Sequence, residues 1–188
     1  EDARVLDSEE IERLAGSFAA AAERAAAAGF DMVEVHGAHG YLIGSFLSPF
    51  TNRRTDEWGG SFEKRMRFPK MIIEGIRGRL GADFPISFRL SSDEFIEGGI
   101  RLPLAVEIAR EVVKSGVDLV HVSAGMIETN RFTGPPPALP MGWNAAAAEA
   151  IRSALSGSGA LVTVAGRIHD GETAEEMLRA GKTDFVSM

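Results

Sequence analysis

The sequence contains no cysteine, and this absence excludes several kinds of chemistry at once. Without thiols, these 188 residues cannot form a disulfide, a thiolate metal site, a cysteine-ligated iron–sulfur cluster or a cysteine nucleophile. No apolar run approaches the roughly 20 residues that span a bilayer. The first ten residues, EDARVLDSEE, are acidic, whereas a signal peptide begins basic and then becomes apolar. We therefore expect a soluble, cytoplasmic protein.

Positive charge is also scarce. The chain has 20 lysines and arginines against 27 aspartates and glutamates, which gives a net charge of -7. This balance argues against a nucleic acid or an anionic membrane surface as the partner. The apolar share of 45% and the charged share of 25% are those of an ordinary globular protein. The length fits one domain with a sizeable core.

One sequence pattern occurs three times along the chain. The stretches AAGFDMVEV (27–35), KSGVDLVHV (114–122) and RAGKTDFVS (179–187) each end a predicted helix on glycine, place an aspartate shortly afterwards and enter an apolar run. Glycine is the usual residue after a helix C-terminus, and short apolar runs of this kind predict buried strands. The repeated pattern predicts a parallel sheet with helices outside it.

The same patterns predict five helices and five strands. Helices are expected at 7–28, where Asp7 and Glu10 suit a capping box, and at 61–80 with a kink at Pro69, 103–114, 142–155 and 173–180. Strands are expected at 31–36, 84–90 and 160–165, and from Asp118 and Asp184 onward. A (β/α)8 barrel and an open doubly wound sheet both use this alternation. Since a barrel needs eight strands, we expect the chain to be a piece of something longer.

Polar residues follow the predicted strands, at the ends where parallel α/β folds place their chemistry. The first strand is followed by His36, His39 and Tyr41, the second carries Arg89, and the later strands are followed by Ser123, Gly125, Gly166 and Arg167. Two positive side chains and several exposed backbone N–H groups suit an anionic ligand that carries phosphate. His36 and His39 lack the further ligands of a zinc site, so no metal is expected.

Each of these residues also has a plainer interpretation. Arg89 near a strand end is equally compatible with an ion-paired structural residue, and Gly166 with turn chemistry. His121, inside a strand, and His169, near a helix N-terminus, are interpreted as structural. Another phosphate-binding barrel, such as an aldolase or isomerase, would need a lysine or glutamate at a strand end. The lysines fall in helices or turns, and Glu34 lies inside a strand.

Long stretches of the chain resemble the Old Yellow Enzyme family of FMN-dependent NAD(P)H:flavin oxidoreductases and ene-reductases. The similarity is carried by HGAHGYLIGSFLSPFTNRRTDEWGGSFEKRMRF (36–68) and extends through FRLSSDE, GVDLVHVSAG and VAGRIHDGETAEEMLRAGKTDFVSM. Some thirty residues that match in order and type are far more specific than a short glycine motif. The resemblance implies a (β/α)8 TIM barrel, of which residues 1–188 would form the C-terminal part, about strands 4 to 8, as a partial FMN-binding domain.

The resemblance also implies roles for the residues after the strands. His36 and His39 would bind the electron-withdrawing oxygen of a small-molecule substrate, and Tyr41 would donate a proton. Arg89 would contact the flavin near N1 and C2. Gly166 and Arg167 would lie beside the FMN phosphate, and Ser123 and Gly125 hold a matching position at the rim. The implied reaction reduces activated C=C bonds in enones, enoates or enoyl thioesters, with NAD(P)H as the reductant.

Several branches of the family remain open at this point. A 2,4-dienoyl-CoA reductase would carry a second histidine in the loop after the third strand, where this sequence has Ile127. That branch and the trimethylamine dehydrogenase branch carry an iron–sulfur module, whose cluster would lie outside this segment. A truncated, non-catalytic half barrel remains open as well, and so does assembly into a homo-oligomer.

Overall fold

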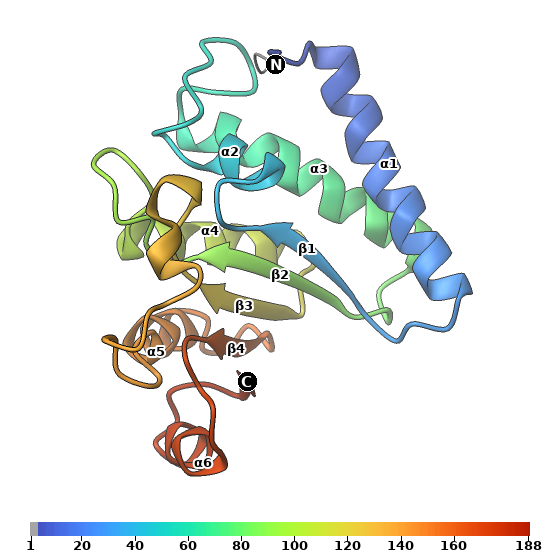
Figure 1. Ribbon diagram of the computed structural model, residues 1–188. Helices are drawn as coiled ribbons and strands as arrows, with labels where there is room; N and C mark the ends of the chain where they lie inside the picture. Colours follow the sequence, from blue (N-terminus) through green and yellow to red (C-terminus); the bar gives the residue numbers. More distant parts are fainter. Residues whose placement is uncertain (1–3) are drawn as a thin grey trace.

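Helices and strands alternate along the chain in the computed structural model, which describes residues 4–188 (Figure 1). The helices are α1 (Ser8–Ala27), α2 (Leu42–Leu47), α3 (Phe62–Leu80), α4 (Leu102–Lys114), α5 (Ala145–Ala154) and α6 (Gly171–Arg179), with a 3-10 helix, η1, at Ile127–Phe132. The strands are β1 (Val33–Gly37), β2 (Ile86–Ser91), β3 (Leu119–Ser123), β4 (Leu161–Ala165) and β5 (Phe185–Ser187).

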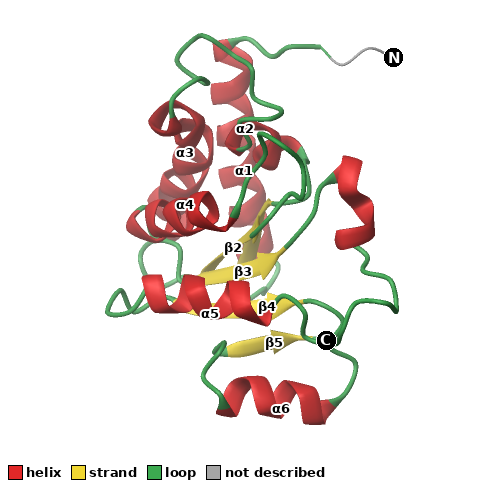
Figure 2. Ribbon diagram, turned by 90° about the vertical axis from the view of Figure 1, so that its left-hand side faces the viewer, coloured by secondary structure: helices red, strands yellow, loops and turns green. Residues whose placement is uncertain are grey.

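The strands form one parallel sheet in the order β1-β2-β3-β4-β5. Helices α3, α4 and α5 lie along one side of this sheet (Figure 2). A doubly wound sheet reverses its strand order, whereas a barrel adds each strand beside the previous one. The observed order is of the second kind.

The repeated aspartate has a structural purpose at the start of two strands. Asp118 Oδ2 accepts a hydrogen bond from the backbone N of Ile86 at 2.8 Å, and Asp184 Oδ2 accepts one from the backbone N of Val162 at 2.9 Å. In both cases the aspartate that precedes one strand accepts a hydrogen bond from a backbone N–H in the first two residues of the adjacent strand. The side chain thereby aligns the beginnings of neighbouring strands.

The two faces of the sheet differ in chemistry. Successive residues of a strand point to opposite faces, and the register places Val35, Phe88, Val120 and Val162 in one row. Apart from Val35, which is 4% exposed, these side chains are completely buried on the side of the helices. The next row, on the opposite face, is polar and consists of His36, Arg89, His121 and Thr163.

The structure confirms the five expected strands and the five expected helices, with ends shifted by a few residues. The capping box of α1 is present, since Asp7 Oδ1 accepts from the backbone N of Glu10 at 2.8 Å and the Glu10 carboxylate accepts from the backbone N of Asp7 at 3.0 Å. The short helices α2 and η1 were not predicted. Pro69 does not end α3, which continues to Leu80 with Pro69 buried. No helix within residues 4–188 has both the length and the apolar character needed to cross a membrane.

Candidate functional site

The loop after β1 is fastened to the ends of the next two strands. The backbone N of His39 donates to Ser91 Oγ at 3.0 Å, and Ser91 Oγ donates to the carbonyl of Gly125 at 2.7 Å. His39 adopts a φ of +64°, in the left-handed region. For a residue other than glycine that conformation costs on the order of 1–3 kcal/mol. The hydrogen bonds through Ser91 offset this cost and hold the loop in place.

This loop brings three aromatic rings together. The ring centroids of His36 and His39 are 5.1 Å apart, and those of His36 and Tyr41 are 5.4 Å apart. Both histidines are half-buried, whereas Tyr41 is 56% exposed. The structure therefore clusters the three side chains that the sequence pattern singled out after the first strand.

Both histidines are held in the neutral form at neutral pH. Burial and then the positive charge of Arg89 lower the pKa of His39 from its ordinary value of 6.5 to about 4. The same two causes lower the pKa of His36. A neutral imidazole has one N–H donor and one bare nitrogen. Each ring can therefore donate one hydrogen bond to a ligand without carrying a charge.

Ser123, at the end of β3, connects His39 to Arg89. Its hydroxyl lies 2.7 Å from His39 Nε2, and Arg89 Nη2 donates to the same oxygen at 3.3 Å. Arg89 is in register with His36 on one side and with His121 on the other. The positive charge expected at this strand end is thus adjacent to the histidine cluster.

A cavity of about 320 Å³ opens beside this connection. Arg89, Ser123, Gly166 and Arg167 all contribute to its wall, whereas Gly125 is not among the lining residues. The remaining wall consists of His121, Ala124, Phe132, Thr133, Pro135, Trp143, Ala165, Ile168, His169, Ser187 and Met188. Four of the five residues proposed from the sequence for an anionic ligand therefore meet at one cavity.

Polar atoms without partners lie in the wall of the cavity. Within residues 4–188, Arg89 Nε, His121 Nε2 and Trp143 Nε1 are buried and make no hydrogen bond. Buried polar atoms are normally paired. Three unpaired ones among the residues that line one cavity make it a candidate binding site.

Close packing leaves little room for a side chain at two glycines of the rim. A Cβ at Gly125, whose φ is +82°, would lie 2.9 Å from the backbone N of Thr133. A Cβ at Gly166 would lie 3.1 Å from Asn144 Cβ and 3.3 Å from Trp143 Nε1. Arg167 uses its Nη1 to donate to the carbonyls of Pro137, at 2.7 Å, and of Leu139. It therefore also fixes the proline-rich loop that forms one wall.

A second polar cluster lies on the same face of the sheet, nearer to the starts of the strands. It was not predicted from the sequence. His121 Nδ1 is 2.9 Å from Glu34 Oε2, which also accepts from Ser87 Oγ at 2.8 Å. Burial raises the pKa of Glu34, but the contacts with His121 and Ser87 outweigh it, and the net shift is downward. The contact with Glu34 agrees with the interpretation of His121 as a structural residue. The signal for this cluster was the alternation of polar and apolar residues in VEVH and LVHV, which places Glu34 and His121 on the polar face.

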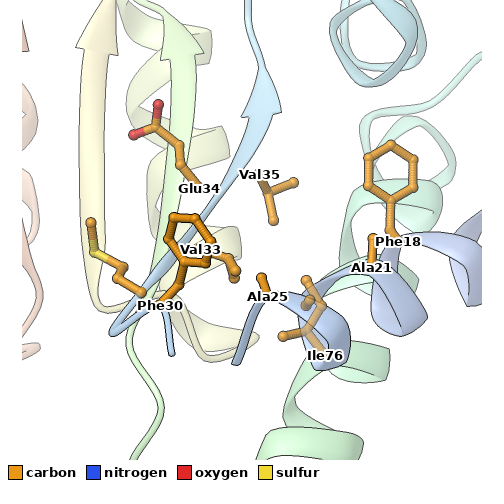
Figure 3. A pocket seen from close by; sticks show the side chains of 10 residues that line it. Phe18, Ala21, Ala25, Phe30, Val33, Glu34, Val35 and Ile76 are labelled. Atoms are coloured by element: carbon orange, nitrogen blue, oxygen red, sulfur yellow. The ribbon is translucent and has the colours of Figure 1, made fainter. Parts of the chain in front are cut away.

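Another pocket, of about 280 Å³, lies away from the histidines, between α1, α3 and the outer edge of β1 (Figure 3). Its labelled side chains are mostly apolar, among them Phe18, Ala25, Phe30 and Ile76, while the Glu34 carboxylate points toward the neighbouring strands. It offers no cluster of donors or acids and is not the catalytic candidate.

Comparison with known proteins identifies the family. The family model described as "NADH:flavin oxidoreductase / NADH oxidase family" matches residues 1–188. The chain belongs to this family. This confirms the resemblance inferred from residues 36–68, because an Old Yellow Enzyme homologue from Zymomonas mobilis is among the similar solved structures.

Members of the NADH:flavin oxidoreductase family match nearly the whole chain. An NADH oxidase from Thermoanaerobacter brockii is 46% identical over 185 residues, which are 98% of this chain and 28% of that protein. An NADPH dehydrogenase from Halalkalibacterium halodurans is 40% identical over 182 residues, 96% of this chain and 51% of that protein. The structure of a 2-naphthoyl-CoA reductase with 2-naphthoyl-CoA has a TM-score of 0.88 at 34% identity, covering 97% of this chain and 27% of that one. The chain thus spans between about a quarter and a half of the length of these relatives.

Proposed function

We propose that this chain forms the catalytic part of an FMN-dependent oxidoreductase that reduces activated C=C bonds with NAD(P)H. In this proposal it corresponds to about strands 4 to 8 of a (β/α)8 barrel, with residues 1–188 as a partial FMN-binding domain. The observation that carries the proposal is the cluster of His36, His39 and Tyr41, which Ser123 joins to the cavity lined by Arg89.

The residues around the cavity suit FMN. Arg89 would place its positive charge beside the flavin N1 and C2 oxygen, and its unpaired Nε is a donor in need of an acceptor. Gly166 and Arg167 would lie at the phosphate, with Ser123 and Gly125 at the adjoining rim. Bound FMN would supply the hydride for the carbon β to an electron-withdrawing group. NAD(P)H is the proposed reductant, and any iron–sulfur cluster would have to lie outside this cysteine-free segment.

His36 and His39 would bind the substrate oxygen. Negative charge grows on that oxygen as the β-carbon accepts hydride, so two neutral N–H donors that face it stabilise the transition state more than the ground state. The loss of one such donor typically costs about 2.7–4 kcal/mol in comparable oxyanion sites. Since the lowered pKa values keep both rings neutral, neither ring ion-pairs with an anionic substrate.

Tyr41 would complete the reaction by giving its proton to the α-carbon. Phenols are protonated at neutral pH, whereas most carboxylic acids are already ionised. Its ring lies beside His36 and is exposed toward the open side of the site. One ring cluster thus offers donors for the oxygen and an acid for the carbon of the same conjugated system.

An aromatic wall favours flat, conjugated substrates. Phe95 and Phe132 stack with centroids 3.8 Å apart, and each lies 6.0 Å from Trp143. Phe132 and Trp143 line the cavity. We propose aryl-substituted enones, enoates or enoyl thioesters as the substrate class, which is supported by the similarity to a reductase solved with 2-naphthoyl-CoA.

Separate assays of the two half-reactions test the proposal. The purified protein reconstituted with FMN is expected to show bound flavin, to be reduced by NADH or NADPH, and to be reoxidised by an aryl enone. Failure to retain FMN after reconstitution would remove the cofactor claim. Retention of FMN and reduction by NAD(P)H, without reoxidation by any activated alkene, would instead contradict the substrate class.

A further inference from the structure

The hydroxyl of Ser123 occupies an unusual position between two nitrogen groups. It is 5% exposed and has two partners among residues 4–188, His39 Nε2 at 2.7 Å and Arg89 Nη2 at 3.3 Å. Arg89 is always protonated and can only donate. Ser123 must therefore accept from Arg89, and its own proton is available for one further bond.

Two proton arrangements are compatible with these distances. In the first, Ser123 donates to a bare Nε2 of His39, so the single proton of the neutral ring lies on Nδ1. In the second, Nε2–H and Arg89 both donate to the serine oxygen, and the serine proton points to no acceptor within the described chain. Buried donors are rarely left unpaired. The first arrangement gives partners to the serine hydroxyl, to His39 Nε2 and to Arg89 Nη2.

We propose that Ser123 is a positioning residue that fixes His39 in the tautomer with its proton on Nδ1. The backbone of His39 is held by Ser91, so the loop presents the ring to Ser123 in one orientation. The Nδ1–H group then remains as the ring's donor for a ligand oxygen. The tautomer stands on geometry alone, while its use in substrate binding rests on the proposed function.

The consequence for binding follows from the populations of the two tautomers. A ligand that needs the Nδ1–H form binds more weakly in proportion to the fraction of protein in that form. If the loss of Ser123 reduces this fraction to between one half and one tenth, the affinity for such a ligand falls by about 2- to 10-fold. Reduction by NAD(P)H does not use this donor and should change little.

Nitrogen-15 NMR of the histidine side chains in the purified full-length protein tests the tautomer directly. In the wild-type protein at neutral pH, His39 is expected to show a protonated Nδ1 and a bare Nε2, with the resonance assigned by its loss in His39→Asn. Ser123→Ala should give a mixture of tautomers, and Ser123→Thr, which keeps the hydroxyl, should restore the wild-type pattern. Ser17→Ala is the control, because it removes an exposed serine hydroxyl of α1 that bonds the carbonyl of Arg13 and none of these groups.

The outcomes are distinct from those that test the proposed function. A protonated Nε2 in the wild-type protein would overturn the proposal even if no variant folds. An unchanged tautomer in Ser123→Ala would overturn it as well. Weaker binding of a phenolate, whose oxygen resembles the developing oxyanion, to FMN-loaded Ser123→Ala but not to Ser123→Thr would support it. The NMR result holds whether or not the protein reduces C=C bonds.

Discussion

Tyr41 is the most exposed of the three clustered rings, with 56% of its surface accessible, and its hydroxyl is the proposed proton donor. Replacement by phenylalanine keeps the ring beside His36 and removes only the hydroxyl group, which carries the proton. We expect Tyr41→Phe to lower the rate of enone reduction by about 10²- to 10⁴-fold, the usual contribution of a general acid. Stopped-flow measurement of both half-reactions checks this. Equal losses in reduction by NAD(P)H would contradict the assignment.

The lowered pKa of His39 predicts a dependence of stability on pH. As the pH falls below about 6.5, the unfolded chain binds a proton at this position, while the folded protein does not until the pH reaches about 4. The free energy of unfolding should therefore decrease across this window and level off below it. Urea unfolding at about pH 7 and pH 5 should show a smaller loss of stability in His39→Asn than in the wild type.

The exposed His169 provides a control for this experiment. His169→Asn should retain the wild-type decline in stability, since the decline is attributed to a ring near Arg89 rather than to histidine content. An identical decline in the wild type and in His39→Asn would show that His39 is not responsible.

The clustered residues His36, His39 and Tyr41 were predictable because they lie within six residues of one another, after a strand. The partners of His39 were not. Ser123 and His39 are 84 residues apart, and a register that no local pattern specifies brings them together. The contact between Glu34 and His121 could not be predicted for the same reason, since it spans 87 residues. Sequence periodicity assigns a residue to a face of the sheet, but it does not name the residue opposite.

At the scale of elements, the end of β1 depends on the absence of a side chain. A Cβ at Gly37 would lie 2.3 Å from Cζ of the buried Phe88 and 3.1 Å from the carbonyl of Arg89. Gly37→Ala should therefore force Phe88 to move and destabilise the protein by about 1–3 kcal/mol. The free energy of unfolding in urea measures this.

Gly16 provides a matched control for the same substitution. It lies within α1, and the position that a Cβ would take there has no atom within 4 Å. Gly16→Ala should stabilise the protein by roughly 0.5–1 kcal/mol, because alanine is the better helix former. Equal effects of the two substitutions would mean that close packing at Gly37 does not matter.

The aromatic wall is built from two connections of the chain, the one between β2 and α4 and the one between β3 and α5, and its effect on substrate choice can be measured. Phe95 follows β2, Phe132 lies in η1 and Trp143 precedes α5. Phe132→Ala should weaken binding of an aryl enone relative to a small alkyl enone, by about 0.5–1.5 kcal/mol for the lost aromatic contact. The ratio of the two kcat/KM values checks this, with Phe132→Leu as a control for apolar volume. An unchanged ratio would place the aryl group elsewhere.

The longer helices were predictable from local signals, whereas α2 and η1 were not. The capping box of Asp7 and Glu10 predicts the start of α1, and apolar spacing predicts the rest of that helix. Each of the two missed helices has six residues, too few for a periodic pattern. They are held by contacts from elsewhere, such as the hydrogen bond from Thr129 Oγ1 to the carbonyl of Glu94. Short helices of this kind depend on tertiary packing rather than on propensity.

At the scale of the whole molecule, the sheet separates packing from chemistry. Parallel sheets covered on both faces usually have continuously apolar strands. Here the strands alternate, so that a valine-rich face packs on the helices and a polar face carries His36, Arg89 and His121. The alternation explains how a rigid sheet can orient polar side chains toward a cavity. It was visible in the sequence, although its meaning depended on knowing that the helices cover only one side.

Binding of FMN should stabilise the whole molecule, because a ligand that binds only the folded state adds to the free energy of unfolding. At a concentration of 100 times Kd the gain is about 2.7 kcal/mol, which corresponds to roughly 5–10 °C in Tm for a chain of this size. Riboflavin has the same ring system without the phosphate, so its shift should be smaller if Gly166 and Arg167 hold that group. Thermal unfolding with each ligand checks both points. Equal shifts would show that the phosphate is not bound, and the absence of any shift with FMN would mean that the cavity beside Arg89 does not hold the cofactor.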